Sequence, residues 1–245
     1  MTTLRRAWVE PAVLEGAAGT LVLPAAAAHR LLRVLRLPDG ELVELFDGTG
    51  RVARGTLQAP GQLVDVTVHA ADDALPPLVV VQAVTRADKL ELVVQKGTEL
   101  GASSFVLFDA ERGQVQLKDR ADKRVERLVR VAADAARQAG RARVPAVAPP
   151  ERLAAVAERV SAFPGLSVIG VIGAERALSE VLAADARVAR GLMVVVGPEG
   201  GLTDAERERL RAAGATEVRL GAFVLRTETA ALAALAAAQA ALGYL

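Results

Sequence analysis

Short apolar runs separated by turn residues mark the first third of the chain. Three such runs, Leu42–Phe46, Val52–Leu57 and Leu63–Val68, flank the segments Asp47-Gly48-Thr49-Gly50 and Ala59-Pro60-Gly61. Asp-Gly and Pro-Gly supply the backbone angles that tight turns need. The pattern therefore predicts three strands joined by hairpins.

A different periodicity precedes these strands. In residues 25–37, Leu31, Leu32 and Leu35 share one helical face, and Arg30, Arg33 and Arg36 share another. This spacing predicts a short basic helix. Together the helix and strands predict a small β-barrel-like domain over residues 1–72, followed by a linker-like stretch rich in Ala, Asp and Pro.

Beyond that stretch, strand-like apolar runs alternate with longer helical patterns, and we assign this part to a second domain, residues 73–245. The expected strands are 78–84, 105–108, 166–172, 191–196 and 217–220, and the expected helices are 88–100, 119–138, 151–160, 203–213 and 227–242. Strands that are apolar throughout are typical of sheets buried on both faces. The fold class is therefore α/β, with a parallel sheet that helices cover on both faces.

Ligands of open parallel sheets bind beyond the carboxyl ends of the strands, so the loops that follow strands are informative. One expected strand runs directly into Gly197-Pro198-Glu199-Gly200-Gly201. Thr203 and Glu206 then have the spacing of a capping box. A tight connection needs some glycine, but three glycines and a proline around one glutamate exceed that need and leave backbone groups open to a ligand. The segment lacks the Gly-Lys-Ser/Thr of a Walker loop and the G-x-G-x-x-G spacing of dinucleotide sites.

The next expected strand leads into a similar loop. Leu220-Gly221 ends the strand, and Arg226-Thr227-Glu228-Thr229 opens an Ala/Leu-rich helix. A structural reading makes Thr227 an ordinary N-cap and lets Glu228 complement the helix dipole. It does not explain Arg226, a cation at the unfavourable end of a helix. Arg226 is therefore placed for a partner.

Composition narrows the chemistry. The chain has 245 residues, 52% of them hydrophobic, no Cys, two His and a net charge of +1. The length fits one large domain or a small one plus a medium one, and the apolar runs are too short to cross a bilayer, so we expect a cytoplasmic protein. Without thiols, and with only His29 and His69, a metal site or a Ser-His-Asp triad is not expected. The reactive group should arrive on a bound cosubstrate.

The two C-terminal loops carry a family resemblance. Gly197–Leu202, followed by Leu220-Gly221 and Val224–Ala230, resembles the signature of the SPOUT methyltransferases, and within them the RsmE family. Other segments are similar to the same family: Leu31–Arg36, Leu45–Gly48, Lys89-Leu90, Gln95–Gly101, Gln138–Arg141 and Val144-Pro145. The resemblance covers nearly the whole chain.

This resemblance implies S-adenosyl-L-methionine as cofactor, no metal, and methylation of N3 of a uridine in bacterial small-subunit (16S) ribosomal RNA. It also implies a PUA-like RNA-binding domain, a C-terminal trefoil knot and a homodimer. By the same resemblance, the cofactor lies against three strand-end loops through Ile172, Gly173, Gly197, Pro198, Glu199, Gly200, Gly201, Leu220, Gly221, Val224, Leu225 and Thr227.

Catalysis of such a transfer requires an unpaired uridine whose N3 proton is lost. We expect Arg226 to stabilise the negative charge that develops on the uracil oxygens. Glu199 and Glu228 are the candidate proton acceptors, each with an alternative role in loop geometry or helix capping.

RNA contact is expected from basic surfaces. Residues 118–143 hold nine Lys and Arg against four acids, a local charge of +5 that also suits an ordinary solvated helix face. The N-terminal region adds Arg5 and the basic helix. With few aromatic residues, phosphate contacts and RNA shape should dominate binding. The expected RNA-binding residues are Arg6, Arg30, Arg33, Arg36 and Arg141.

Two positions depart from the family pattern. Arg137-Gln138 stands where the family often has Glu-Gln, and Ala222-Phe223 stands where an Arg often follows Leu-Gly. Three alternatives stay open from sequence: a non-catalytic RNA-binding or ribosome-assembly protein, a SPOUT enzyme with another RNA target, and a small-molecule nucleotide enzyme that uses the glycine-rich loop for phosphate.

Overall fold

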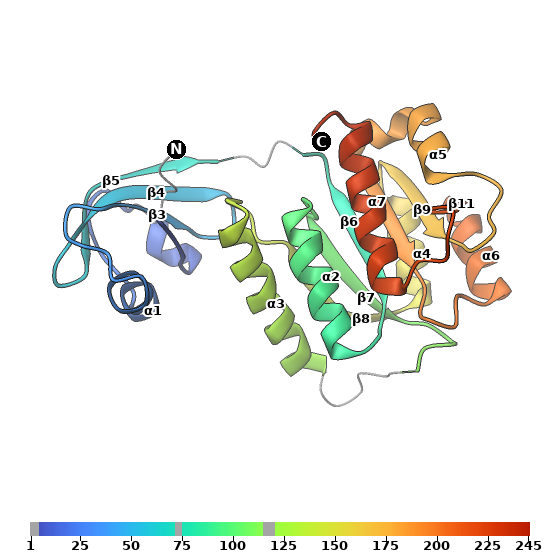
Figure 1. The fold of residues 1–245 in the computed structure, drawn as a ribbon, viewed down its shortest axis with the longest axis horizontal. Helices are drawn as coiled ribbons and strands as arrows, with labels where there is room; N and C mark the ends of the chain where they lie inside the picture. The colour runs from blue at the N-terminus through green and yellow to red at the C-terminus, as the bar shows by residue number, and fades with distance from the viewer. Residues whose placement is uncertain (1–4, 72–74, 115–120) are drawn as a thin grey trace. The chain divides into compact units, whose positions relative to one another are not determined.

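The fold is described by a computed structural model that covers residues 5–71, 75–114 and 121–245 (Figure 1). By their contacts these residues form two compact units. The first lies within residues 1–74 and also includes 133–144, and the second comprises 75–132 and 145–245. The expected domain boundary at residues 72 and 73 lies outside the described residues and stays a prediction.

The first unit is built on a five-stranded sheet in the order β1-β3-β4-β5-β2. The three predicted strands are confirmed as β3 (Leu42–Phe46), β4 (Arg51–Gln58) and β5 (Gln62–Ala70). β4 pairs antiparallel with both β3 and β5. The structure adds β1 (Arg5–Trp8), parallel to β3, and β2 (Gly19–Val22), antiparallel to β5. Both have only four residues, too few for alternation to reveal them.

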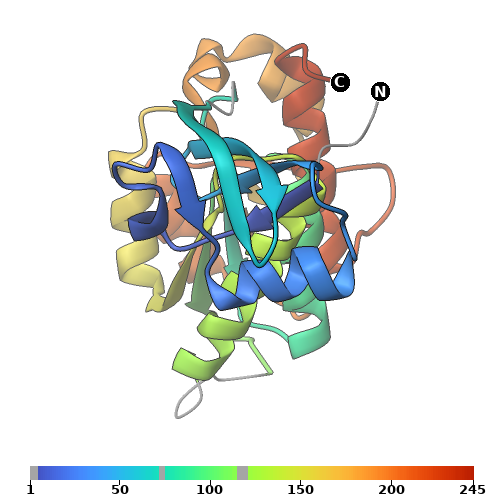
Figure 2. The same cartoon turned by 90° about the vertical axis from the view of Figure 1, so that its left-hand side faces the viewer.

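The predicted basic helix is present as α1 (Ala25–Ala28), which continues into the π-helical segment η2 (His29–Val34). Figure 2 shows this helical segment running beside the strands of the first unit. Leu31 is fully buried in the same cluster as Ala7 and Leu45, whereas Arg33 is exposed. A short 3-10 turn, η1 (Pro11–Leu14), buries Leu14 against the same core.

The second unit contains a six-stranded sheet in the order β11-β9-β10-β6-β7-β8, in which every pair is parallel. Its strands are β6 (Leu78–Ala83), β7 (Ser104–Asp109), β8 (Ala146–Arg152), β9 (Leu166–Gly170), β10 (Leu192–Val196) and β11 (Thr216–Val218). β6 and β10 are buried at every position. This confirms the prediction of a parallel sheet that is covered on both faces.

Helices α2 (Ala87–Glu99) and α7 (Thr227–Ala241) pack together beside the sheet (Figure 1), and α5 (Leu178–Ala184) packs on α7. Gly97 lets α2 approach closely, because a Cβ there would lie 2.8 Å from the ring of Phe105. Helices α4 (Leu153–Ala162) and α6 (Asp204–Ala212) contact each other. Their Val156, Val160 and Leu210 join the apolar core on the opposite side of the sheet.

Several boundaries differ from the expectations. Residues 151 and 152, expected in a helix, form the end of strand β8, because the run Ala146–Arg152 pairs with β7. Strands β9 and β11 end at Gly170 and Val218, so residues 172 and 220 lie in loops. Helix α5 and the 3-10 segment η3 (Ala186–Arg190) were not predicted.

Helix α3 is described over Ala121–Gln138, so its expected start at residue 119 lies outside the described residues. Among the helices that the structure describes, none combines the length and the apolar character needed to cross a bilayer.

Candidate functional site

Three loops meet at the carboxyl edge of the sheet. They follow the adjacent strands β9, β10 and β11 and comprise residues 171–177, 197–203 and 219–226. The first and third are joined by backbone bonds, since Val171 N donates to Val218 O (2.9 Å) and Leu178 N donates to Arg219 O (3.0 Å). The structure therefore brings together the three segments expected to hold the cofactor.

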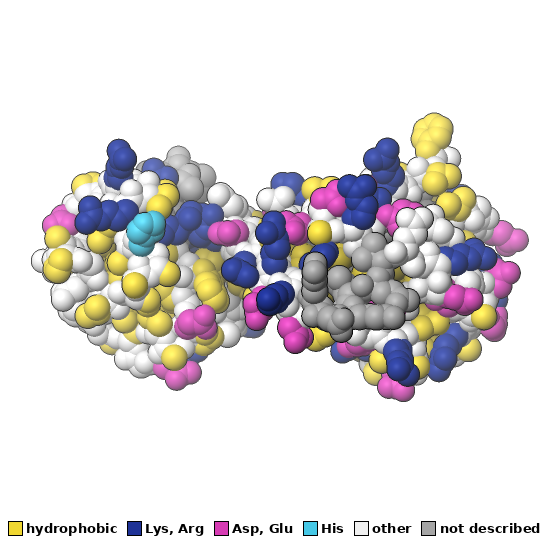
Figure 3. All heavy atoms as spheres, turned by 90° about the horizontal axis from the view of Figure 1, so that it is seen from below, with side chains coloured by type: hydrophobic (Ala, Val, Ile, Leu, Met, Phe, Trp, Pro, Cys, Tyr) yellow, Lys and Arg dark blue, Asp and Glu magenta, His cyan; other side chains and the backbone are white. Residues whose placement is uncertain are grey.

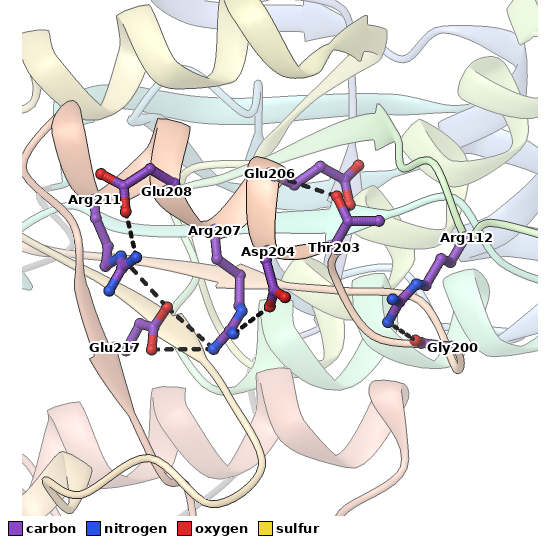
Figure 4. A network of polar contacts seen from close by, with 9 residues as sticks. All are labelled: Arg112, Gly200, Thr203, Asp204, Glu206, Arg207, Glu208, Arg211 and Glu217. Atoms are coloured by element: carbon purple, nitrogen blue, oxygen red, sulfur yellow. Dashed lines mark hydrogen bonds and ion pairs between the residues drawn. The ribbon is translucent and has the colours of Figure 1, made fainter.

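The glycine-rich loop between β10 and α6 is fixed at its far end by the predicted capping box. Thr203 N donates to Glu206 Oε2 (2.8 Å), and Glu206 N donates to Thr203 Oγ1 (3.2 Å). Glu206 Oε1 also accepts from Glu111 N (2.8 Å). In Figure 4, Arg112 Nη1 donates to Gly200 O (3.3 Å). These bonds hold the loop in one shape, so its backbone is organised before any ligand arrives.

Helix α6 also fixes the strand that leads into the third loop. Arg207 contacts both Asp204 (2.6 Å) and Glu217 of β11 (3.2 Å), and Arg211 reaches Glu217 at 3.7 Å (Figure 4). Arg211 also pairs with Glu208. β11 has only three residues, so these ion pairs add to its short ladder with β9.

Thr227 connects the second and third loops from a buried position. Its hydroxyl donates to Gly197 O (2.8 Å) and accepts from Gln82 Nε2 (2.8 Å). The N-cap of α7 is Arg226, which has extended backbone angles, and Thr227 is the first residue inside the helix. The reading of Thr227 as an ordinary N-cap is therefore wrong, because its hydroxyl bonds to another loop instead of to its own helix.

Glu199 lies in a polar cluster at the same edge. Its Oε1 accepts from Lys89 Nζ (2.7 Å) and from Thr85 Oγ1 (2.8 Å), and Lys89 Nζ also lies 3.4 Å from Glu228 Oε2. The hydrogen bond from Lys89 is the main cause that lowers the pKa of Glu199 to about 2, and Thr85 adds to the shift. The same hydrogen bond raises the pKa of Lys89. The cluster therefore keeps one cation between two candidate catalytic carboxylates.

The three loops also carry exposed apolar side chains and open glycines. Ile172, Phe223 and Val224 are 75%, 88% and 70% exposed, which is unusual for side chains of this type. At Gly173 (φ +77°) and Gly201 (φ +69°), an added Cβ would meet nothing within 4 Å. Such a surface offers apolar walls and free backbone to a ligand with a flat apolar part and polar ends.

The other candidate residues on these loops differ in how far they are buried. Leu220 packs against Gly170, where a Cβ would lie 2.9 Å from Leu220 Cδ1, and Leu225 is half-buried. Pro198 is buried and its carbonyl accepts from Gly201 N (2.8 Å). Gly221 and Arg226 are exposed. Every expected residue of the cofactor and catalytic sets thus lies on the three loops or in the first turn of α7.

Sequence reasoning missed Gln82 and Thr85, and it noted Lys89 only within a segment that is similar to the family. All three follow or end β6, the strand next to β10. The signal was available in principle, because β6 is also an apolar strand whose carboxyl end falls at this edge. What the pattern lacked was the strand order that places β6 beside β10.

The expected RNA-binding residues all lie in the first unit. Arg33 and Arg36 are exposed, and Arg30 and Arg141 are half-buried. Arg6 is 10% exposed and pairs with Glu44 (2.5 Å). Figure 3 shows Lys and Arg side chains gathered on one face of this unit. Lys118 and Arg120 of the basic run lie outside the described residues, and RNA contact by this set stays a prediction.

Comparisons with known proteins agree with this geometry. The family described as RNA methyltransferase domain matches residues 73–239. Ribosomal RNA small subunit methyltransferase E of Mycobacterium bovis is 37% identical over 213 residues, which are 83% of this chain and 80% of that protein. The Bacillus subtilis protein of the same name is 34% identical over 233 residues, 90% of each chain.

Solved structures extend the likeness to the fold. The crystal structure of ribosomal RNA small subunit methyltransferase E from Neisseria gonorrhoeae bound to S-adenosyl methionine has a TM-score of 0.79 at 30% identity and covers 97% of both chains. A putative methyltransferase from Legionella pneumophila in complex with the same cofactor has a TM-score of 0.79 at 26% identity, covering 98% of both. The chain belongs to the ribosomal RNA small subunit methyltransferase E family.

Proposed function

We propose that this protein transfers the methyl group of S-adenosyl-L-methionine to N3 of a specific uridine in bacterial 16S ribosomal RNA. The observation that carries the proposal is the meeting of three glycine-containing loops at one edge of the sheet, where Lys89 also contacts Glu199 and Glu228. Family membership and the two cofactor-bound relatives support the same reaction.

The proposed organisation has two functional parts. Residues 1–72 form a PUA-like RNA-binding domain, which the mainly antiparallel sheet and its helical segment support. Residues 73–245 form the SPOUT methyltransferase domain with a trefoil knot at its C-terminal end. Two features are compatible with such threading. β11 lies at the edge of the sheet next to β9, and Thr227, at the start of the last helix, hydrogen-bonds to the carbonyl of Gly197 in the loop after β10. We further propose a cytoplasmic homodimer that acts on ribosomal RNA or the small subunit.

The residues present fit the cofactor. The open backbone at Gly173 and Gly201 suits its polar groups, and exposed Ile172 and Val224 suit the faces of an adenine ring. Leu220, Gly221, Leu225 and the 197–201 loop complete the proposed pocket. When bound, S-adenosyl-L-methionine supplies a methyl group that its sulfonium already makes electrophilic. The chain's task is to hold uridine N3 in line with that methyl, which lowers the barrier by up to about 7–11 kcal/mol in favourable cases.

Arg226 and one of the two candidate carboxylates are proposed to assist the transfer. Arg226, exposed at the start of α7, stabilises negative charge on the uracil oxygens. A carboxylate with a pKa of about 2 is a weak base, so Glu199 is poorly suited to accept the N3 proton. Glu228 is the better proton acceptor, because its Oε2 accepts no hydrogen bond from the described chain and lies 3.4 Å from Lys89 Nζ.

Two measurements test this function. Calorimetry should show that the purified protein binds S-adenosyl-L-methionine, and absence of binding would refute the enzyme in favour of a non-catalytic RNA-binding or ribosome-assembly protein. Mass spectrometry of RNA from cells with and without the protein should then reveal one N3-methyluridine in 16S ribosomal RNA that depends on it. A dependent methyl group on another RNA or on a ribose hydroxyl would assign a different target.

A further inference from the structure

Several guanidinium nitrogens in the first unit are buried without a hydrogen-bond acceptor from the described chain. They are Nη1 of Arg6, Nε of Arg30 and Nε of Arg137, whereas Nε of Arg6 is paired with Glu44 Oε1. Burying a charged donor without an acceptor is costly, so groups of this kind usually have a partner. Three such side chains in one compact unit therefore call for a common explanation.

Arg6 lies at the centre of the group. Its side chain is nine-tenths buried, and its guanidinium carbon lies 4.7 Å from the centre of the Phe46 ring. Nη1 faces the chain after α3, because a Cβ on Gly140 would lie 3.8 Å from it. Its one acidic partner, Glu44 (2.5 Å), is shared with Arg54 (3.0 Å).

Arg30 and Arg137 approach this point from two other segments. Arg30 belongs to η2, which packs on the strand that carries Arg6. Arg137 lies in the last turn of α3, and its side chain is 14% exposed. Burial, followed by the neighbouring Arg137, lowers the pKa of Arg30, and Asp134 opposes that shift. The two guanidinium groups are therefore close enough to repel each other.

The acids nearby do not balance this charge. Glu44 is divided between Arg6 and Arg54, and Asp134 lies 3.5 Å from Arg137 with its side chain 75% exposed. Exposed pairs at that distance contribute little. The four guanidinium groups of Arg6, Arg30, Arg54 and Arg137 thus have two carboxylates near them, those of Glu44 and Asp134. A neutral hydrogen-bond acceptor such as water would not remove this excess of positive charge, whereas an anion would.

We propose that Arg6, Arg30 and Arg137 form a binding site for one phosphate group. A phosphate offers several acceptor oxygens to converging guanidinium donors and removes the charge excess. All three residues belong to the first unit, so the site lies within one compact part of the chain. Its natural ligand is a phosphate of the RNA backbone, an assignment that rests on the proposed function, whereas phosphate binding itself does not.

The first test uses the full-length chain and inorganic phosphate. Thermal unfolding is followed with increasing phosphate, and with chloride at matched ionic strength. The wild type should be stabilised by phosphate beyond the chloride control, because a ligand that binds the folded state raises the melting temperature. Arg30→Gln and Arg137→Gln should lose that difference, and Arg209→Gln, which removes an exposed charge from α6, should keep it.

A gain-of-affinity variant separates binding from misfolding. Asp134→Asn removes the carboxylate that competes with the anion, at an exposed position where folding should not suffer. Phosphate should bind this variant several-fold more tightly than the wild type. If phosphate stabilises no more than chloride, or if Arg137→Gln and Asp134→Asn respond as the wild type does, the site does not exist.

A second test identifies the source of the phosphate. Affinity for a 16S ribosomal RNA fragment should fall about tenfold in Arg137→Gln, since hydrogen bonds to charged groups carry that order of free energy. The slope of log affinity against log salt should drop by about 0.7–0.9, the effect of one lost phosphate contact. Unchanged RNA binding with lost phosphate binding would assign the site to free phosphate. Binding of S-adenosyl-L-methionine, measured in parallel, should be unaffected in every variant. If the wild type did not bind this cofactor, the proposed function would fail, whereas the result on phosphate binding would stand independently.

Discussion

Lys89 is the residue whose removal most directly tests the polar cluster. The pKa of Glu199 is lowered from 4.5 to about 2, mainly by Lys89, so this carboxylate stabilises the folded state fully above pH 4.5. That contribution is lost as the pH falls toward 2. Lys89→Met should therefore raise the pH of acid unfolding, because Glu199 would protonate at a higher pH. Circular dichroism during acid titration measures the shift.

Lys96 provides the matched control for this change. It lies in the same helix and pairs with Glu99 at 2.8 Å, and its side chain is 43% exposed. Exposed pairs of this kind contribute roughly 0–1 kcal/mol, so Lys96→Met should leave the acid midpoint almost unchanged. Equal midpoints for Lys89→Met and the wild type would show that Lys89 does not control the ionisation of Glu199.

Arg226 separates catalysis from cofactor binding. As an exposed N-cap residue it contributes little to packing. Arg226→Ala should lower turnover about 10²–10³-fold, as expected when one preorganised group that stabilises developing charge is removed. Affinity for S-adenosyl-L-methionine, measured by calorimetry, should change little. Arg226→Lys should recover part of the rate, and full turnover of the Ala variant at saturating RNA and cofactor would remove Arg226 from the mechanism.

At the scale of elements, one hydroxyl joins a strand, a loop and a helix. Thr227 of α7 bonds to Gln82 of β6 and to the carbonyl of Gly197 after β10. Thr227→Val keeps the shape but removes the hydroxyl that donates to Gly197 O and accepts from Gln82 Nε2, which would keep only its 3.3 Å bond to Ala83 O. The expected cost is about 1–3 kcal/mol. Urea unfolding should show this loss, and cofactor affinity should fall with it. Thr229→Val, two residues on and exposed, should change neither quantity; similar losses in both variants would contradict the role of this contact.

The elements also show what a local pattern can predict. β6 and β10 are buried at every position and, apart from Gln82, apolar, and they were predicted nearly to the residue. β1 and β2 span only four residues each, and β8 contains Pro149 and Pro150 and ends in the charged pair Glu151-Arg152. Such segments form strands because they pair with the free edge of a neighbouring strand. That pairing depends on the tertiary fold and leaves no pattern in the local sequence. The glycine loops were recognisable by motif, whereas Gln82, Thr85 and Lys89 joined the site only through the order of strands in the sheet.

At the scale of the whole molecule, the division of the chain is not linear. Residues 133–144 belong to the first unit, although the sequence pattern assigned them to the second. Ala136 and Ala142 pack with Phe46 and Val52, and Val144 N donates to Gly48 O (2.9 Å). The linker rich in Pro and Ala suggests a boundary between two units along the chain. Its composition cannot show that residues 133–144, which come later in the sequence, pack into the core of the first unit.

This arrangement predicts that residues 1–71 alone are an incomplete folding unit. Cutting there would expose the fully buried ring of Phe46 and leave the turn at Gly48 and Thr49 without its backbone and Arg143 contacts. The fragment should unfold at lower urea than the same residues fused through a flexible linker to 133–144, because the fusion restores the apolar cluster. Denaturation followed by the fluorescence of Trp8, the chain's one tryptophan, compares the two. Equal midpoints would mean that the first unit folds without the later segment, and that residues 133–144 only rest on a core that is already complete.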